Sequence, residues 1–596
     1  MPTQDVTEPE SAGVPGARRA ARHSHRSGRR KPAQPSAASR RQRIPGLVWA
    51  ATALNIGLML IFSVLYPAYY AFDETGHVSR VLQTQNGVVA PTPGTAPYVD
   101  GVSHSYNTYT AHEEPPFANY LPLARDARPS MVFFGGPEPV TDAALPNQLA
   151  QHPPGYYLLA AGLLDVVPNS SHLAWDQTVG LLRLLDVLLL SPLPILSWAL
   201  ARRFARRRIA LAAAFAPALI PALARLGGST NNDDLLILLI GTFSLLTVQI
   251  LRGDWRLRTA IGIASCIAIG LLVKGFALVL PPVALLAYLI AWRRDRGAGR
   301  WAPVIAVVVG SALGGIWWLR NVIVYGAVQP AGLTHDQAAQ VWPSLPPGSH
   351  VHFGTFLRKS FDAFITTFWG AFGLAAPPSL PGVLTVIATV IALALLVVAF
   401  IPRGQALEPA LEPALDPAID PAIDRGVSGA GSRRVDLAVL VLPMLLILVP
   451  LLVHAWADYE RTGQTIGIQG RYLYTSIVAL VAISAAGLDS LLARAPWWIE
   501  RALPLLACLL ALSIEATGIW VVLTKLWMPA HDSLTDDMSK LLHAIGRQSP
   551  WPGSVTAAFI AATATAALVA LVASALAARA THDRGNKSRP TIAILP

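Results

Sequence analysis

The sequence predicts an all-α fold, a polytopic transmembrane helical bundle of about 12 spans. Hydrophobic residues make up 53% of the 596 residues, and charged residues only 14%. Apolar stretches of about the 20 residues that a helix needs to cross a bilayer recur along most of the chain. A soluble domain could not bury so much apolar surface, so the composition excludes that class of protein.

Each predicted span is an apolar stretch bounded by polar or charged residues. The stretches lie near residues 46–68, 177–200, 208–226, 232–251, 258–273, 275–292, 302–320, 380–402, 435–456, 471–491, 500–523 and 554–579. A further apolar stretch at 155–168 is shorter than a span. It is predicted to be an interfacial helix within the first external loop.

Basic residues set the predicted orientation. Lys and Arg concentrate in short loops at alternate span ends, as the positive-inside rule expects for a cytoplasmic face. Examples are Arg202, Arg203, Arg252, Arg293 and Arg294. The net charge of +11 is therefore explained by topology rather than by nucleic acid. Both termini are predicted to be cytoplasmic, and the Ala, Arg and Pro usage is typical of a high-GC bacterium, which makes the plasma membrane the predicted location.

The chain divides into a core, a second helical part and three polar segments. Residues 1–44 are predicted to be a disordered basic tail, 45–402 the main transmembrane core with external loops 71–176 and 321–378, and 435–579 the C-terminal spans. Residues 403–434 read as a cytoplasmic linker, because Pro recurs at every fourth place within it. Residues 580–596 form a second cytoplasmic tail.

The two cysteines and the glycine pattern argue against a disulfide in an external loop, a structural zinc site and ATP hydrolysis. Cys266 and Cys508 both fall inside predicted spans, so neither can staple an external loop. The spacings of a structural zinc site and a Walker-type glycine loop are both missing from the sequence, which argues against ATP hydrolysis within this chain.

The first candidate site follows the first span. Asp73 and Glu74, with His77, are poised for general-base work or cation binding at the external surface. The alternative is that Asp73 only caps a short helix, because Asp is a favoured residue at that position.

Two more polar clusters lie on the predicted external side. His152 precedes two prolines and Tyr156; taken alone it reads as structural, and its neighbours give it weight. Asn232 and Asp233 begin the fourth span, where helix capping competes with a functional role.

Three cations at external span ends are not explained by the orientation rule. Lys274, Arg320 and Arg471 suit a phosphate group held at the membrane surface. The alternative for any one of them is contact with lipid headgroups. An aromatic stripe at 361–372 beside Arg358 and Lys359 predicts an interfacial helix, either as an anchor or as a groove for a lipid substrate.

The order of these motifs resembles the GT-C class of membrane glycosyltransferases that use polyprenyl-phosphate sugars. The nearest branches are protein mannosyltransferases, aminoarabinose transferases and bacterial proteins of the DUF2142 type. The motifs are Phe72-Asp73-Glu74-Thr75-Gly76-His77, His152-Pro153-Pro154-Gly155-Tyr156-Tyr157-Leu158, Arg183-Leu184-Leu185, Ser229-Thr230-Asn231-Asn232-Asp233, Leu272-Val273-Lys274-Gly275, Trp317-Trp318-Leu319-Arg320-Asn321 with Tyr325-Gly326, and Gln469-Gly470-Arg471-Tyr472-Leu473. As a set they cover roughly residues 46–490.

The resemblance implies roles for the candidate residues. Asp73 and Glu74 would be the catalytic carboxylates: Asp73 as the base that deprotonates the acceptor, and Glu74, with His77, in support of it or in binding the acceptor or a metal. The donor phosphate would be held by Lys274, Arg320 and Arg471. The residues that would bind or support the substrates are His77, His152, Tyr156, Asn232, Asp233 and Tyr472.

The implied partners are a polyprenyl-phosphate-linked sugar, a cell-envelope glycan or glycolipid acceptor, and membrane lipids. No cofactor is implied with certainty, and a divalent metal is left open. The chain departs from the oligosaccharyltransferases, because Leu319 rather than Asp follows Trp317-Trp318 and no large soluble domain follows the last span.

Two other functions stay open: a transporter or flippase for lipid-linked saccharides, and a non-catalytic scaffold. A transporter should carry ionisable residues near the bilayer midplane. Arg183, Asp186 and Glu515 are the candidates, and the spacing of Arg183 and Asp186 predicts that they pair on one helix face.

Overall fold

The computed structural model describes residues 44–109, 115–119, 122–140, 145–296, 301–374, 378–401, 430–528 and 534–579. Within these residues the regular elements are helices, and β pairing is limited to isolated bridges. The all-α prediction is therefore confirmed. The predicted tails lie outside the described residues apart from Ile44, and so does the linker apart from residues 430–434, which belong to a helix.

Ten helices or helix pairs of the described chain are long and apolar enough to cross a membrane. They are α1 (Gly46–Leu65), α5 (Trp175–Leu190) with α6 (Leu193–Ala201), α9 (Asp233–Leu251), the 3-10 segment Gly275–Val279 with α11 (Leu280–Arg294), α12 (Trp301–Tyr325), α15 (Gly382–Ala399), α17 (Ala430–Thr462), the 3-10 segment Gly470–Ser476 with α18 (Ile477–Leu491), α19 (Trp497–Val522) and α21 (Gly553–Arg579).

Two predicted spans take a different form. The stretch at 208–226 is broken into α7 (Arg207–Ala213), a 3-10 turn and α8 (Pro221–Gly227). Proline disrupts the interior of a helix, and here Pro217 and Pro221 each start a new segment. The stretch at 258–273 forms α10 (Leu257–Leu271), which is helical but shorter than the other spans.

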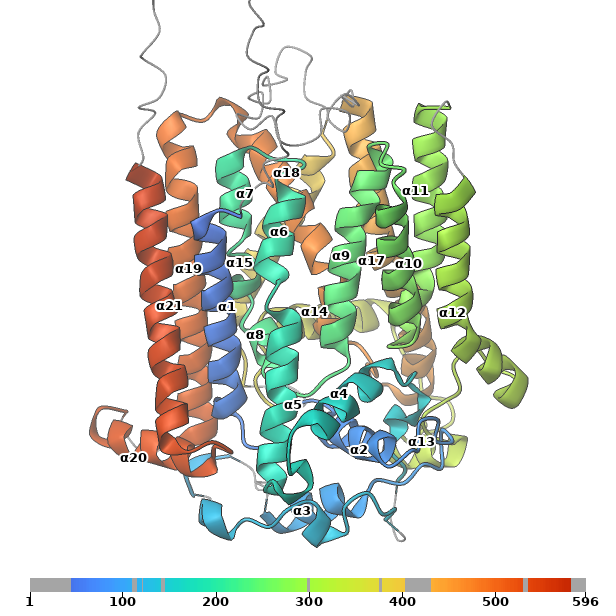
Figure 1. The fold of residues 1–596 in the computed structure, drawn as a ribbon, viewed down its shortest axis with the longest axis vertical. Coiled ribbons are helices and arrows are strands. Elements are labelled where there is room, and N and C mark those ends of the chain that lie inside the picture. The colour runs from blue at the N-terminus through green and yellow to red at the C-terminus, as the bar shows by residue number, and fades with distance from the viewer. Residues whose placement is uncertain are drawn as a thin grey trace, which may run out of the picture.

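The short helices gather at one end of the bundle. In Figure 1 they occupy the lower end, while the start of α1 and the end of α21 lie at the upper end. These short helices are α2 (Glu74–Gln85), α3 (Asp100–Tyr109), α4 (Gly155–Val166), α13 (His335–Val341) and α20 (Leu534–Gln548). At 12 residues α4 is too short to span, which agrees with the prediction of a short apolar helix there.

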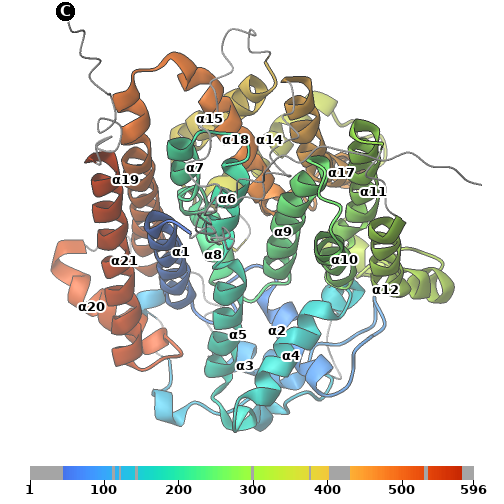
Figure 2. The same cartoon turned by 45° about the horizontal axis from the view of Figure 1, so that its top comes forward.

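The long helices form two groups on either side of α9. Figure 2 shows α1, α19 and α21 side by side at one edge, and α10, α11 and α12 at the other. Within these groups α1 packs on α21, and α10 packs on α12. Buried apolar side chains form a separate cluster on each side.

The aromatic stripe lies on α14 (Phe353–Trp369) and the residues after it. Its last rings turn into the protein: Phe372 is fully buried and stacks on Phe62, and Phe368 contacts Tyr474. Phe361 is 48% exposed. The expectation that the rings of this interfacial helix point toward acyl chains does not hold for these inner rings, because they pack against the first span and the segment that carries Arg471.

Candidate functional site

Asp73 stands at the N-cap position of α2, yet its carboxylate does not cap the helix. The backbone of Asp73 is left-handed, with φ 59°, and its side chain makes no hydrogen bond to the first turn. Asp and Asn adopt this conformation more readily than most residues. The carboxylate instead accepts a hydrogen bond from Arg471, with 2.6 Å between Oδ2 and Nη2. The capping alternative therefore does not describe this side chain.

Glu74 is fully buried in a bidentate ion pair. Arg183 Nε and Nη2 donate to its two oxygens at 2.8 and 2.6 Å, and the backbone amides of Tyr69 and Thr230 also donate to it. The other guanidinium hydrogens of Arg183 bond the carbonyl oxygens of Ser63, Tyr66 and Pro67. Such a fork-to-fork pair is among the strongest contacts that Arg makes.

The predicted pairing of Arg183 with Asp186 is wrong. Asp186 Oδ2 accepts a hydrogen bond of 2.7 Å from the hydroxyl of Tyr156, whereas Arg183 turns to Glu74. Arg183, Asp186 and Tyr156 are all buried. Tyr156 thus contacts a carboxylate of α5, and its polar atom is satisfied inside the protein.

Arg471 reaches Asp73 because its chain segment approaches α14 closely. A Cβ on Gly470 would lie 2.4 Å from the carbonyl oxygen of Phe364, so only glycine fits there. Arg471 is buried, and its Nε and Nη1 atoms have no hydrogen-bond partner among the described residues. Two donors of a buried guanidinium are therefore available for an anion.

Lys274 is positioned by the contact between α4 and the end of α10. The amide of Gly155 donates to the carbonyl of Leu272 at 2.6 Å, and a Cβ on Gly155 would clash with that oxygen. Lys274 Nζ lies 2.6 Å from Asp233 Oδ1. The ring of Tyr472 lies 5.5 Å from Lys274 Nζ and 5.7 Å from the guanidinium of Arg471. Tyr472 therefore links the two cations.

Arg320 lies apart from this cluster. Its Nη1 donates to Asn321 at 3.1 Å, and its guanidinium covers the rings of Trp317 and Tyr325 on the same helix. Within the described part of the chain, the contacts of Arg320 are with its own helix end and do not reach Asp73, Lys274 or Arg471. The structure thus brings two of the three predicted phosphate-binding cations together.

The start of α9 supplies acceptor oxygens. Asn232 occupies the N-cap position without a side-chain cap, and its amide donates weakly to the carbonyl of Val273 at 3.4 Å. Asn232 Oδ1, Asp233 Oδ2 and both carboxyl oxygens of Asp234 are buried with no partner among the described residues. Buried acceptors without donors are costly, so this group is suited to a ligand that carries hydroxyl groups.

Two neutral histidines border the site. His77 Nδ1 lies 3.1 Å from the hydroxyl of Tyr157, and burial lowers the pKa of His77 to about 3 despite the opposing attraction of Asp73. His152 is also buried, and its Nδ1 has no partner among the described residues. Burial and the charge of Lys274 hold the pKa of His152 well below its usual value.

The charge of Arg471 keeps Asp73 ionised. Burial would raise the pKa of Asp73, but the attraction of Arg471, with smaller contributions from His77 and Lys274, lowers it from 3.8 to about 2. The carboxylate is therefore fully charged at neutral pH.

Arg225 is a neighbour of the site that the sequence did not single out. Its guanidinium lies 4.8 Å from the ring of Phe72, and the guanidinium of Arg471 lies 5.3 Å from the same ring. Nη1 of Arg225 donates to the carbonyls of Ala371 and Gly373, while Nη2 is buried without a described partner. The only signal in the sequence is an Arg at the end of an apolar stretch.

Within the described residues, no group of three or more His, Cys, Asp or Glu side chains is placed to hold a metal ion. Two of the acidic side chains of the site pair with cations: Asp233 with Lys274, and Asp73 with Arg471.

Comparisons with known proteins give one family and distant structural likenesses. None of the curated proteins matches the sequence. ArnT from Cupriavidus metallidurans, in a structure bound to undecaprenyl phosphate, is 13% identical with a TM-score of 0.37, covering 89% of this chain and 76% of that one. An oligosaccharyltransferase from Archaeoglobus fulgidus is 10% identical with a TM-score of 0.37, covering 85% of this chain and 56% of that one.

The family assignment rests on most of the chain. The model of the predicted membrane proteins called DUF2142 matches residues 56–481, a range that runs from the first span into α18 and includes every predicted site residue. This chain therefore belongs to the DUF2142 family of predicted membrane proteins.

Proposed function

We propose that this protein is a membrane glycosyltransferase that moves a sugar from a polyprenyl-phosphate donor to a cell-envelope glycan or glycolipid on the extracytoplasmic face. The observation that carries the proposal is Arg471. It holds Asp73 with one nitrogen and keeps two further donor atoms without a partner among the described residues. The proposed anion site would lie directly beside an ionised carboxylate, which is what transfer from a phosphate leaving group requires.

Arg471 and Lys274 would bind the donor phosphate. Both are largely buried, and both contact the ring of Tyr472, so a phosphate between them would meet two positive charges in a poorly hydrated place. Arg225, with one unpartnered nitrogen beside Phe72, is a third candidate donor. Arg320 is assigned no role in this phosphate site, because it contacts only its own helix end.

The acceptor oxygens at the start of α9 would bind the sugar. Sugar hydroxyl groups donate hydrogen bonds, and Asn232, Asp233 and Asp234 offer four buried oxygens without described donors. Asp233 already pairs with Lys274, which places this group next to the proposed phosphate site.

The proposed reaction is an in-line displacement at the anomeric carbon. The acceptor hydroxyl oxygen forms a bond to that carbon as the bond from the carbon to the phosphate oxygen breaks, and the electron pair leaves with the phosphate. Asp73 takes the hydroxyl proton, and Arg471 and Lys274 stabilise the phosphate that departs. Inversion of the anomeric configuration follows.

Donor binding would also activate the base. A carboxylate whose pKa is about 2 is a weak base at neutral pH. A donor phosphate that engages Arg471 would compete with Asp73 for the guanidinium and so raise the pKa of the carboxyl group. The ion pair of Asp73 with Arg471 is then the state without donor, and binding of the donor breaks it.

Glu74 is proposed as a positioning residue rather than as a second catalytic group. Its oxygens already accept four hydrogen bonds from Arg183, Tyr69 and Thr230. The pair with Arg183 would fix the turn that presents Asp73.

The orientation rule and the nature of the donor support each other. The site lies at the end of the bundle opposite the basic loops, which are predicted to be cytoplasmic. Nucleotide sugars are cytoplasmic, so a transferase on the other face needs a donor carried by a lipid.

The test is sugar transfer from radiolabelled polyprenyl-phosphate sugars by the full-length protein in membranes. Asp73→Asn is expected to lower transfer by about a hundred- to ten-thousand-fold, the usual contribution of a general base. Arg471→Ala should also abolish donor binding. Arg320→Ala is the matched control: it removes an Arg at an external span end and should leave transfer unchanged.

Measurement of donor binding alongside transfer distinguishes the transferase from a transporter or a scaffold. Binding with no transfer by the wild-type protein, across a panel of donors and acceptors, would favour the transporter or scaffold. Equal loss of transfer in Arg320→Ala and Arg471→Ala would contradict the assigned phosphate site.

A further inference from the structure

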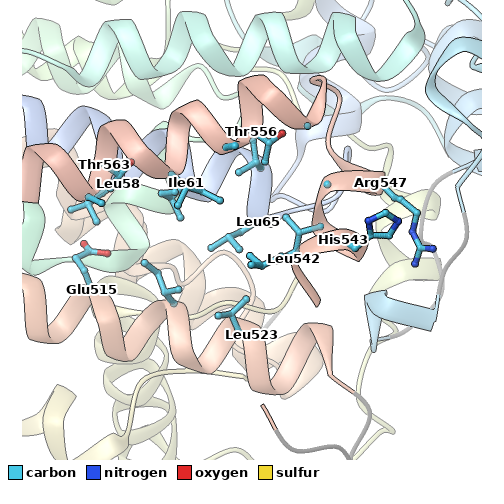
Figure 3. Close-up of a pocket in the computed structure, with 18 of the residues that line it drawn as sticks. Leu58, Ile61, Leu65, Glu515, Leu523, Leu542, His543, Arg547, Thr556 and Thr563 are labelled. Carbon is cyan, nitrogen blue, oxygen red and sulfur yellow. The ribbon is translucent and has the colours of Figure 1, made fainter. Parts of the chain in front are cut away.

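A separate cavity lies among the helices at the opposite edge from α12. It has a volume of about 830 Å³, within the range of ligand pockets, and it is bounded by α1, α19, α20 and α21 together with the loop around Arg125. Figure 3 shows Leu58, Ile61 and Leu65 of α1 facing this space. None of its lining residues belongs to the predicted catalytic, phosphate-binding or substrate-binding residues.

The shaft of the cavity is apolar and about one membrane leaflet deep. On α21 it is lined from Gly553 to Ala567, which corresponds to roughly 21 Å of helix. Along α19 and the residue after it, the lining runs from Leu512 to Leu523, roughly 16 Å. A bilayer core is about 30 Å thick, so one leaflet contributes about half of that depth.

The mouth of the cavity carries positive charge. Arg547 and His543 of α20 lie at one end of the space in Figure 3, and both are exposed. Arg125 donates to the carbonyls of Gly546 and Ser549 at 2.8 and 3.2 Å, and its Nε has no described partner. No carboxylate of the described residues forms an ion pair with Arg125 or Arg547. Arg128, in contrast, is already paired with Asp176.

A buried carboxyl group lines the inner part of the cavity. Glu515 lies beside Thr563 and Leu58 at the end of the space away from Arg547 (Figure 3). The residue is 1% exposed, and neither carboxyl oxygen has a hydrogen-bond partner among the described residues. Leu54, Leu512 and Ala567 line the cavity about one helical turn farther from Arg547 than Glu515 does, so the apolar lining ends a short way beyond this group. The cavity is therefore suited to a chain that ends within one leaflet.

We propose that this cavity binds an anionic glycerophospholipid, with the phosphate at Arg547, Arg125 and His543 and an acyl chain in the shaft. Arg offers a fork of donors that matches phosphate oxygens. A polyprenyl chain is much longer than one leaflet, so the depth favours an acyl chain over a prenyl chain. The site is distinct from the cluster of Asp73, Lys274 and Arg471 and does not depend on the proposed transferase activity.

The lipid would hold α20 against the long helices. Leu541, Ala544 and Ile545 of α20 are buried, whereas Leu542 is 50% exposed and faces the cavity. An acyl chain in the shaft would cover Leu542 together with the cavity faces of α1, α19 and α21. Occupancy of the site should therefore stabilise the protein.

The test is native mass spectrometry of the full-length protein released from nanodiscs, with phosphatidylglycerol, phosphatidylcholine and undecaprenyl phosphate as separate probes. We expect one phosphatidylglycerol to be retained, and phosphatidylcholine to be retained roughly tenfold less. Arg547→Ala should lower phosphatidylglycerol retention on the order of tenfold, while Arg358→Ala, which removes an exposed Arg from α14, should not.

Two variants on α21 test whether the acyl chain occupies the shaft. Ala564→Phe fills the cavity and should prevent retention, whereas Ala562→Phe, at an exposed position that does not line it, should not. Ala516→Phe fills the same space from α19 and serves if Ala564→Phe does not fold. Equal retention in all variants would overturn the site. Preferential retention of undecaprenyl phosphate, lost in Ala564→Phe, would overturn the assignment to a phospholipid.

Discussion

Asp73 and Glu74 are neighbours in the sequence, but their carboxylates lie in two different kinds of surroundings. Glu74 belongs to a closed network, in which every guanidinium hydrogen of Arg183 donates to an acceptor among the described residues. Asp73 belongs to an open network. In it, two guanidinium nitrogens of Arg471 and both carboxyl oxygens of Asp234 have no hydrogen-bond partner among the described residues. A closed network stabilises a fold, whereas an open one is prepared for a ligand.

The difference gives the two regions opposite responses to mutation. In the closed network the loss of one partner strands a buried charge. In the open network the removal of an unpartnered group relieves a cost that the free protein carries. Stability and transfer activity should therefore change together in the first region and separately in the second.

The largest effect is expected for Glu74→Gln. Removing this charge leaves Arg183 buried without its ion pair, which should lower the free energy of unfolding by about 3–5 kcal/mol. Glu500→Gln is the control, because the partner of Glu500, Arg206, is 24% exposed, and the expected loss is below about 1 kcal/mol. Unfolding in mixed micelles measures both. If Glu74→Gln folds with unchanged stability and only transfer is lost, then Glu74 acts in the chemistry. The distinction between its closed network and the open network of Asp73 would then be wrong.

A smaller effect of opposite sign is expected for Asp234→Leu. Both carboxyl oxygens of Asp234 are buried without described partners, so an apolar residue of similar size should raise the free energy of unfolding by about 1–3 kcal/mol. Asp489→Leu is the control, since Asp489 accepts a hydrogen bond of 2.7 Å from Arg206 and its loss should destabilise.

The same substitution should weaken transfer. If sugar hydroxyl groups bond Asp234, the KM for the donor should rise on the order of tenfold. A stabilised protein with an unchanged KM would remove Asp234 from the sugar site, and a destabilised one would mean that its oxygens have partners in the free protein.

The sequence could predict the fold class and the type of residue in the site, because both depend on local patterns. Apolar length alone locates α1, α9 and α21. It fails at 208–226, where hydropathy counts apolar residues but Pro217 and Pro221 interrupt the helix.

The pairings within the site could not be predicted, because they depend on packing between distant segments. Asp73 and Arg471 are 398 residues apart in the chain. Arg183 had a carboxylate three positions away at Asp186, but it pairs with Glu74, 109 residues away, because the fold places the first residue of α2 beside Arg183. The motifs likewise could not separate Arg320 from Lys274 and Arg471, since all three are cations near span ends.

The smallest and most specific effect concerns the pKa of Asp73. Because the folded pKa of about 2 lies below the ordinary 3.8, the pair with Arg471 stabilises the fold fully above pH 4, and this contribution is lost as the pH falls from 3.8 towards 2. A phosphate that takes over Arg471 should raise the pKa, because burial then acts on the carboxyl group without the opposing attraction of the guanidinium. Infrared titration of the carboxyl band with and without polyprenyl phosphate measures the change, and the spectrum of Asp73→Asn identifies the band. An unchanged pKa in the presence of bound lipid would mean that the phosphate does not compete for Arg471, and the open network would then have no role in activating the base.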